Sequence, residues 1–138
     1  MKLENIMSTR IVTVELDDTL DQVREIFDHV AFHHVLVIED GELFGVLSDR
    51  DLFKAISPYI GTPAETSRDR ETLTRKVHQV MSRHPLSLKP DASVADAIKL
   101  FNNNKISFIP IVDDKKQPIG VVSWRDIIRH VDPEQFEN

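Results

Sequence analysis

The chain has 138 residues, of which 41% are hydrophobic and 29% charged, and its formal net charge at pH 7 is −6. This predicts one compact domain with enough apolar side chains for a core. The acidic balance and the lack of a basic run argue against nucleic acid as a partner. Cysteine is absent, which excludes disulfides, thiol nucleophiles and cysteine metal sites. Since no apolar stretch suits a signal peptide or a membrane span, we expect a cytoplasmic protein without membrane association.

The first part of the chain, residues 4–56, predicts the order strand, helix, strand, strand, helix. The first strand is IVTVE, and Thr19 follows it as the expected N-cap of a helix with apolar side chains at helical spacing. Two apolar runs, HVLVIE and LFGVLS, are joined by turn residues and predict two strands. Ser48 then begins a helix that carries Leu52 and Ile56 on its apolar side.

The next segment, residues 57–77, has the composition of a linker. It opens with Pro58, Gly61 and Pro63 and continues with alternating charges. Helix breakers followed by charged residues predict a mobile cover, with a polar helix from about Thr66 onward.

The rest of the chain repeats the first part. Met7-Ser8 corresponds to Met81-Ser82, 74 residues later, and the motif GVLSDRDL returns as GVVSWRDI. The elements return as well: PLSLK, a helix capped by Ser93, FIPIVD, PIGVVS and a helix that Ser123 begins. Two copies are too few for a solenoid. We therefore predict a mixed α/β (α+β) fold of two units packed about a pseudo-twofold axis.

The repeated motif admits two interpretations. As Ser-x-x-Asp it is a capping box, in which the Ser side chain accepts from the third helical N–H and the acid reaches back to the cap. As the junction between a strand and a helix, it is also a seat for an anionic ligand. Arg50 and Arg125 stand beside the acid in the two copies and would supply a phosphate donor.

The doubled motif, led in each copy by IMSTRIVTV or VMSRHPLSL, resembles the tandem cystathionine beta-synthase (CBS) domain pair, or Bateman module. The resemblance implies two CBS units, 1–56 and 78–138, joined by the linker 57–77, with adenine-nucleotide sites in clefts between the units. It implies that the motif acid holds the ribose hydroxyls, that the second strand wraps the base and that the first strand supplies a hydroxyl near it. Carried over residue by residue, these roles fall on Asp51 and Asp126 with Ser48 and Ser123 beside them, on Val35, Leu36, Ile109 and Pro110, and on Thr13 and Ser87.

The two copies also differ from each other. The family pattern favours a proline on the second strand, and Pro110 provides it in the second copy, whereas the first copy has Leu36. Asp49 corresponds to Trp124. A carboxylate beside a triphosphate is unfavourable unless a metal ion intervenes, and Trp124 suits either a base or a protein interface. We therefore do not expect two equal sites.

The histidines are better explained by a ligand than by a metal. His33 and His34 are adjacent in a predicted strand, where neighbours point to opposite faces. No cysteine pair or HExxH motif is present, so we expect no metal site. Basic side chains near phosphates and side chains on a solvated surface remain equal alternatives for a wider set: Arg10, His34, Arg50, Arg83, His84 and Arg125. In the linker, Arg68 and Arg70 could reach phosphates, so a ligand would order that segment.

Catalysis is not expected, because the four glycines form neither a P-loop nor a dinucleotide-binding turn. The resemblance to the CBS domain pair implies a regulatory module that binds AMP, ADP or ATP, with or without Mg²⁺, and acts through an unidentified partner protein or its own dimer. The alternatives are binding of S-adenosylmethionine, an assembly scaffold with empty clefts and, third, a nucleotide hydrolase. We expect the two helices of each unit on one side of its sheet, and a homodimer that covers their apolar positions, among them Phe27, Phe53, Phe101 and Trp124.

Overall fold

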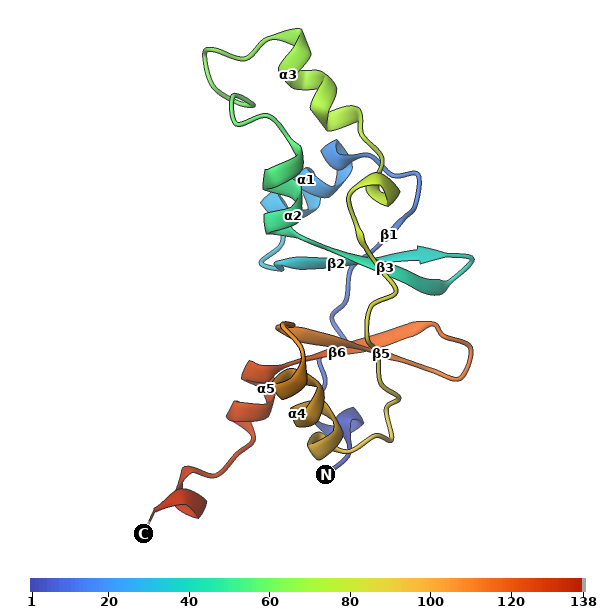
Figure 1. Ribbon diagram of the computed structural model, residues 1–138, viewed down its shortest axis with the longest axis vertical. Coiled ribbons are helices and arrows are strands. Elements are labelled where there is room, and N and C mark those ends of the chain that lie inside the picture. Colours follow the sequence, from blue (N-terminus) through green and yellow to red (C-terminus); the bar gives the residue numbers. More distant parts are fainter. Residues whose placement is uncertain (138) are drawn as a thin grey trace. The chain divides into compact units, whose positions relative to one another are not determined.

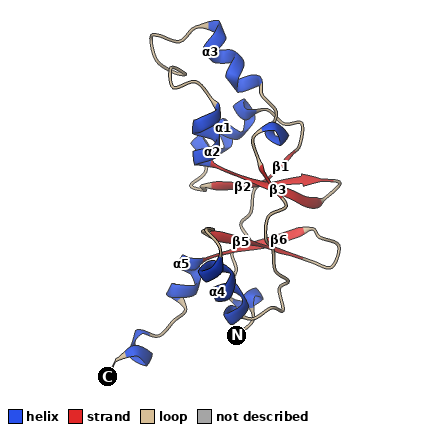
Figure 2. Cartoon of the chain, viewed as in Figure 1, coloured by secondary structure: helices blue, strands red, loops and turns tan. Residues whose placement is uncertain are grey.

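The computed structural model describes residues 1–137 and contains both helices and strands, as the predicted α+β class requires (Figures 1 and 2). The chain divides into two compact units. One unit is Val12–Pro85, and the other combines Met1–Ile11 with the chain from Leu86 onward.

The unit Val12–Pro85 contains a four-stranded sheet in the order β1-β2-β3-β4. β1 runs parallel to β2, and the other neighbours are antiparallel. Its elements are β1 (Thr13–Glu15), α1 (Leu20–His29), β2 (His34–Glu39), β3 (Glu42–Ser48), α2 (Asp49–Ala55), α3 (Ser67–Glu71), two short 3-10 helices (Thr72–Thr74 and Val77–Gln79) and β4 (Ser82–Arg83).

The core of this unit lies between α1, α2 and one face of the sheet. Figure 1 shows both helices on the same side of β2 and β3, as expected. Leu20, Val23 and Leu52 from the helices join Val35 and Leu47 from the strands, and all are fully buried. The predicted start of α1 is confirmed, because the Thr19 hydroxyl accepts a hydrogen bond from the third helical N–H and forms a capping box.

The second unit has the same plan around a two-stranded sheet. α4 and α5 lie on one side of β5 and β6 (Figure 1). Ser93 caps α4 as predicted. The core includes Leu3 and Ile6 from the chain's beginning, packed with Ile109 and Val122 of the strands. The elements are a 3-10 helix (Leu3–Asn5), α4 (Val94–Asn103), β5 (Phe108–Val112), β6 (Pro118–Ser123), α5 (Trp124–Arg129) and a 3-10 helix (Pro133–Phe136).

One predicted strand is absent. PLSLK forms only a single bridge, from Leu88 to Ile111, and does not form a strand. The backbone N–H of Leu88 donates to the Pro110 carbonyl (3.1 Å), and its carbonyl accepts from Val112 (3.0 Å). Pro85 is the first of these five residues and Pro90 follows the last, and because proline lacks an N–H it cannot extend the ladder. The strand predicted as IVTVE is likewise shorter, Thr13–Glu15.

The segments that lead the two repeats are exchanged between the compact units. Ser82–Arg83, which leads the second repeat, pairs with β3 of the first. Ser8, which leads the first repeat, exchanges two backbone hydrogen bonds of 2.9 Å with Val121 of β6. The compact units therefore cross the repeat boundaries seen in the sequence.

The linker has a polar helix where one was predicted, since Thr66 caps α3 with a capping box. The Ser57 hydroxyl donates to Oδ1 of Asp69 (2.8 Å), and the Ser57 N–H donates to the Thr72 hydroxyl (3.0 Å). Leu73 is buried. The ends of the linker are therefore held together, whereas its mobility stays a prediction. Within the described residues, no helix is both long and apolar enough to cross a bilayer.

Candidate functional site

The motif Ser48-x-x-Asp51 lies where β3 ends and α2 begins. The Ser48 hydroxyl accepts from the N–H of Asp51 (3.0 Å), and Oδ2 of Asp51 accepts from the N–H of Ser48 (3.0 Å). The capping box is therefore confirmed. It engages one carboxylate oxygen, and in the described part of the chain no hydrogen bond reaches the other, Oδ1. This oxygen can accept a hydrogen bond from a ligand.

The register of the sheet brings several predicted site residues to one face. Thr13 of β1 lies opposite Leu36 of β2, and His34 lies opposite Ser48. Directly opposed residues share a face, and so do residues two apart on a strand. The face that carries Thr13, His34, Leu36 and Ser48 thus leads to the start of α2. Val35 points to the other face and belongs to the core, so a ligand could meet only its backbone.

Two histidines and a carboxylate meet at the same junction. Nδ1 of His33 lies 2.9 Å from Oδ2 of Asp49, and the Asp49 N–H donates to the His33 carbonyl (2.9 Å). Burial acts to raise the pKa of Asp49, but the hydrogen bonds with the His33 ring and the Arg50 N–H outweigh it and keep that pKa below its usual value. Burial lowers the pKa of His34, although Asp49 and Asp51 oppose the shift. His34 is therefore mainly neutral at pH 7 and would act as a hydrogen-bonding group.

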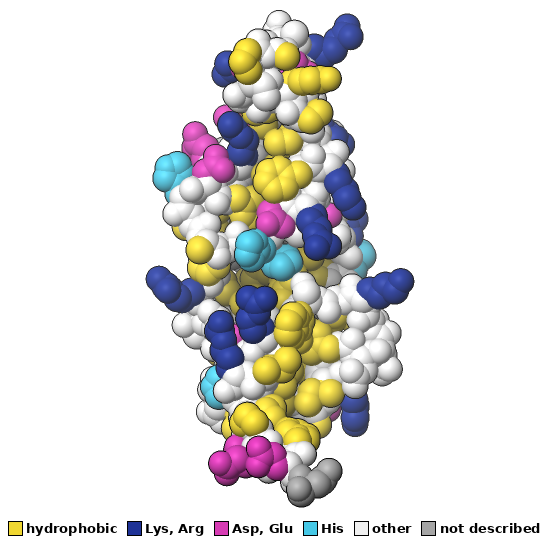
Figure 3. Space-filling model, turned by 90° about the vertical axis from the view of Figure 1, so that its left-hand side faces the viewer, with side chains coloured by type: hydrophobic (Ala, Val, Ile, Leu, Met, Phe, Trp, Pro, Cys, Tyr) yellow, Lys and Arg dark blue, Asp and Glu magenta, His cyan; other side chains and the backbone are white. Residues whose placement is uncertain are grey.

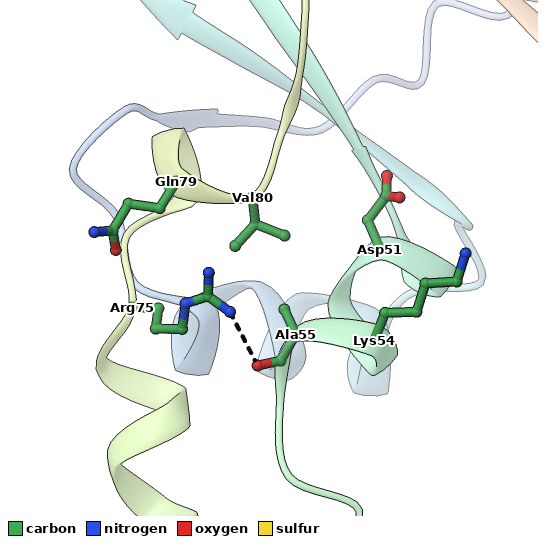
Figure 4. A pocket seen from close by; sticks show the side chains of 6 residues that line it. All are labelled: Asp51, Lys54, Ala55, Arg75, Gln79 and Val80. Carbon is green, nitrogen blue, oxygen red and sulfur yellow. Dashed lines mark hydrogen bonds between the residues drawn. The ribbon is translucent and has the colours of Figure 1, made fainter.

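A pocket of about 310 Å³ lies beside α2 (Figure 4). Of the predicted site residues, only Asp51 lines it; Arg50 is exposed and is not part of the lining. The sequence had not indicated the others. Lys54 follows Asp51 by three residues on the helix, so the two side chains are neighbours on its surface. This spacing could have indicated Lys54 as a further pocket residue. The full lining is Asp51, Lys54, Ala55, Arg75, Gln79 and Val80.

The second unit repeats the junction with other side chains. The Ser123 hydroxyl accepts from the Asp126 N–H (3.1 Å), and Oδ2 of Asp126 accepts from the Ser123 N–H (2.8 Å). The Leu88–Ile111 bridge brings Ser87, which is exposed, beside Pro110. Like Val35, Ile109 belongs to the core. The remaining motif cation, Arg125, lies over the ring of Trp124, with Cζ 5.5 Å from the ring centroid.

Comparison with known proteins gives the family. The family described as CBS domain matches the chain twice, over residues 3–58 and 77–133. The chain belongs to this family. A CBS domain-containing protein of Dictyostelium discoideum is 31% identical over 130 residues, which are 91% of this chain and 88% of the relative.

Solved CBS domain pairs share the fold. The structure of CBSX2 in complex with AMP has a TM-score of 0.75 at 23% identity, and the match covers 93% of each chain. The CBS domain pair of MJ0100, in complex with 5'-methylthioadenosine and S-adenosyl-L-methionine, has a TM-score of 0.73 at 22% identity, with 94% of each chain covered. These likenesses establish two CBS units of α+β structure in the present chain.

The CBS units offer few groups for a metal ion. Among the described residues, no group of three or more His, Asp or Glu side chains is arranged to bind one. Asp49 and His33 contact each other, and Asp51 is engaged by its helix cap. The chemistry available at each junction is therefore that of hydrogen-bond acceptors and, in the pocket beside α2, of Lys and Arg donors.

Proposed function

We propose that this CBS domain pair is a regulatory module that binds an adenine nucleotide, AMP, ADP or ATP, at the strand–helix junction of its units. The observation that carries the proposal is the doubled Ser-x-x-Asp box, in which each acid uses Oδ2 for the cap and keeps Oδ1 for a ligand. The AMP named with CBSX2, and the two adenosine derivatives named with MJ0100, support an adenosine-type ligand.

The proposed contacts follow the geometry of the sheet face. Oδ1 of Asp51, and of Asp126 in the second unit, accepts the ribose hydroxyls. Thr13 and Ser87 turn a hydroxyl toward the base. Leu36 and Pro110 lie beside them, and His34 adds a neutral hydrogen-bonding group in the first unit. Because Asp49 carries a charge at that junction, a triphosphate there would require Mg²⁺.

The module acts by passing its ligand state to a partner protein or to a second copy of itself, without catalysing a reaction. Exposed apolar side chains favour a homodimer. They stand at equivalent positions of α2 and α5, the last helix of each repeat. Phe53 on α2 is 65% exposed, and Ile128 on α5 is 61% exposed. Burying such side chains is favourable, so a second copy is the simplest cover.

The proposal is tested by ligand-dependent thermal stability. A ligand at a hundredfold excess over its dissociation constant stabilises a protein by about 2.7 kcal/mol. For a chain of this size the melting temperature should rise by about 5 to 10 degrees with the preferred nucleotide. Asp51→Asn and Asp126→Asn keep a capping side chain but lose the charge, so each should reduce the rise and the double variant should abolish it.

A matched control separates ligand binding from helix capping. Asp96 forms the same box with Ser93 at the start of α4, with its Oδ2 3.1 Å from the Ser93 nitrogen. Asp96→Asn should therefore leave the ligand-induced rise intact. If calorimetry detects no binding of AMP, ADP, ATP or S-adenosylmethionine to the wild-type chain, the proposal is wrong and the boxes are helix caps alone.

A further inference from the structure

The pocket beside α2 contains two cations that the proposed ribose contact does not use. Asp51, Lys54 and Arg75 carry the charges of its lining, and Ala55 and Val80 give it apolar surface. All of these residues belong to the unit Val12–Pro85. The pocket therefore combines one hydrogen-bond-accepting carboxylate with an excess of positive charge.

Arg75 has spare donors directed at this space. Its Nη1 donates to the Ala55 carbonyl at 3.4 Å, which is long for a hydrogen bond. A guanidinium has five N–H donors, and among the described residues the Arg75 guanidinium makes this one hydrogen bond. Figure 4 shows the guanidinium beside Ala55, on the opposite side of the pocket from the Asp51 carboxylate. An anionic oxygen would make shorter and stronger bonds to it than this carbonyl does.

Lys54, the second cation of the lining, lies away from Arg75. Its side chain extends on the far side of Asp51 from Arg75 (Figure 4). In this arrangement the ammonium and the guanidinium lie apart, so Lys54 does not hold the same ligand group as Arg75. Its effect on an anion at Arg75 should be weaker, because the ammonium lies on the other side of Asp51 from that anion and solvent and salt screen the charges of both exposed cations.

We infer that Arg75 makes this pocket selective for a phosphorylated ligand, a nucleoside phosphate, over an uncharged nucleoside or a sulfonium nucleoside. The inference rests on the proposed function, since it takes the ribose hydroxyls to be held by Asp51. A negative group is repelled from the Asp51 side and attracted to the Arg75 side, so the pocket orients a ligand that has a diol at one end and a phosphate at the other. A positively charged sulfonium gains nothing from Arg75.

The test compares AMP with adenosine by calorimetry in an Asp126→Asn background, so that one junction is titrated. We expect the parent to prefer AMP by about tenfold or more, the scale of one charge-assisted contact. Arg75→Gln should weaken AMP binding by about tenfold and leave adenosine binding within twofold. Arg75→Lys should restore part of the preference, and Lys54→Gln should reduce it less. Lys76→Gln is the matched control, because it removes the neighbouring charge outside the lining and should change neither affinity.

The outcomes separate this inference from the proposed function. If the wild-type chain binds none of AMP, ADP, ATP and S-adenosylmethionine, the proposed function is wrong, and if it binds adenosine as tightly as AMP, only the selectivity is wrong. If both bind to the parent and Arg75→Gln weakens both equally, or weakens neither, the selectivity by Arg75 is wrong while the nucleotide site stands. The melting temperature without ligand shows whether the lost bond to Ala55 has disturbed the fold, and Arg75→Lys retains a donor for that carbonyl.

Discussion

At the scale of single residues, the acid of each repeated motif has a structural role and room for a functional one. Asp51 closes a capping box through Oδ2, and Asp126 does the same in the second unit. The sequence suggested helix capping and ligand binding as competing explanations. In the structure the cap uses one carboxylate oxygen, Oδ2, and the proposed ligand contact would use the other, so one explanation does not exclude the other.

His34 should make the folded chain sensitive to mild acid. Its pKa lies below the ordinary value of 6.5, mainly because burial disfavours the charged ring. Near pH 6 the unfolded chain therefore binds more protons at this residue, and the free energy of unfolding falls as the pH drops through 6.5. Thermal melts between pH 8 and pH 5.5 should show this loss, and His34→Gln should reduce it.

Asp49→Asn should have the opposite effect to His34→Gln on the pH dependence of stability. It removes a carboxylate that favours the charged form of His34, so the loss of stability on acidification should become steeper. A pH dependence that is identical in the wild type and both variants would contradict this role of His34.

Residue-level prediction reached the motif but not the whole pocket. Ser48 and Asp51 could be found because capping depends on neighbours along the chain. Arg75, Gln79 and Val80 could not, because they reach α2 only through the folding back of the segment after the linker. The core position of Val35 could have been predicted from the sequence HVLVIE. Alternate residues of a strand point to opposite faces, so Val35 lies on the face opposite to His34 and Leu36.

At the scale of the elements, β2, β3, β5, β6 and all four main helices were predictable from periodicity and capping residues. β1 was predicted too, although longer than it is, whereas the strand pairing of the segments that lead the repeats was not predictable. β4 has two residues, and its counterpart at Ser8 is a single bridge, so neither has a pattern of its own. Each of these segments pairs with the free edge of a β-hairpin, β4 with β3 and Ser8 with β6. The pairing depends on the folded hairpin and not on a pattern in the segment itself.

Gly45→Ala should destabilise the fold, because the exchanged segment passes close to β3. A Cβ at Gly45 would lie 2.7 Å from the Ser82 carbonyl oxygen and 2.7 Å from the Met81 sulfur. Relieving this overlap requires backbone movement, at a cost of about 1–3 kcal/mol. Gly120→Ala should behave alike, since its Cβ would lie 2.8 Å from the Ser8 carbonyl oxygen. Chemical denaturation measures both.

Adding Met81→Ala to Gly45→Ala should not relieve the strain completely, because the contact with the Ser82 backbone remains. An alanine tolerated at both glycines without loss of stability would show that the exchanged segments are not held closely in solution.

The linker should exchange its amide hydrogens unevenly. Residues 58–65 carry turns and exposed side chains, whereas Leu73 and Val77 are buried, and the Val77 N–H donates to the Asp18 carbonyl (2.8 Å). Hydrogen exchange followed by mass spectrometry should therefore find fast exchange before Thr66 and slow exchange around Val77. Slow exchange throughout residues 57–72 without ligand would contradict the predicted mobility.

At the scale of the whole molecule, duplication explains the sequence repeat, and the exchange of leading segments explains why the compact units do not coincide with it. Each unit needs a segment that the other repeat supplies, Met81-Ser82 in one unit and Met7-Ser8 in the other. A single repeat expressed alone would lack one edge of its sheet. Each repeat therefore depends on the other to complete its compact unit.

The exposed apolar side chains of the last helices should drive association into a dimer. Figure 3 shows hydrophobic side chains at the surface of the molecule, and Phe53, Trp124 and Ile128 are among the most exposed large ones. Single exposed apolar residues are common, but here the same helical position is apolar and exposed in both repeats. Burying a Phe or Ile side chain contributes about 1.5–3 kcal/mol, so two such positions in each chain can supply much of a dimer's free energy of association. Light scattering after size-exclusion chromatography should show a dimer at micromolar concentration.

Phe53→Glu and Ile128→Glu should each shift that dimer toward the monomer and leave the circular dichroism spectrum unchanged, because neither side chain supports the core of its own unit. Tyr59→Glu is the control, since Tyr59 is 54% exposed but lies in the linker, outside the last helices. A dimer that survives both helix substitutions would place the interface elsewhere, and a wild-type monomer at micromolar concentration would contradict the dimer itself. If nucleotide binding and the dimer are coupled, the preferred nucleotide should also change the dimer's dissociation constant, and Asp51→Asn should remove that change while the dimer remains.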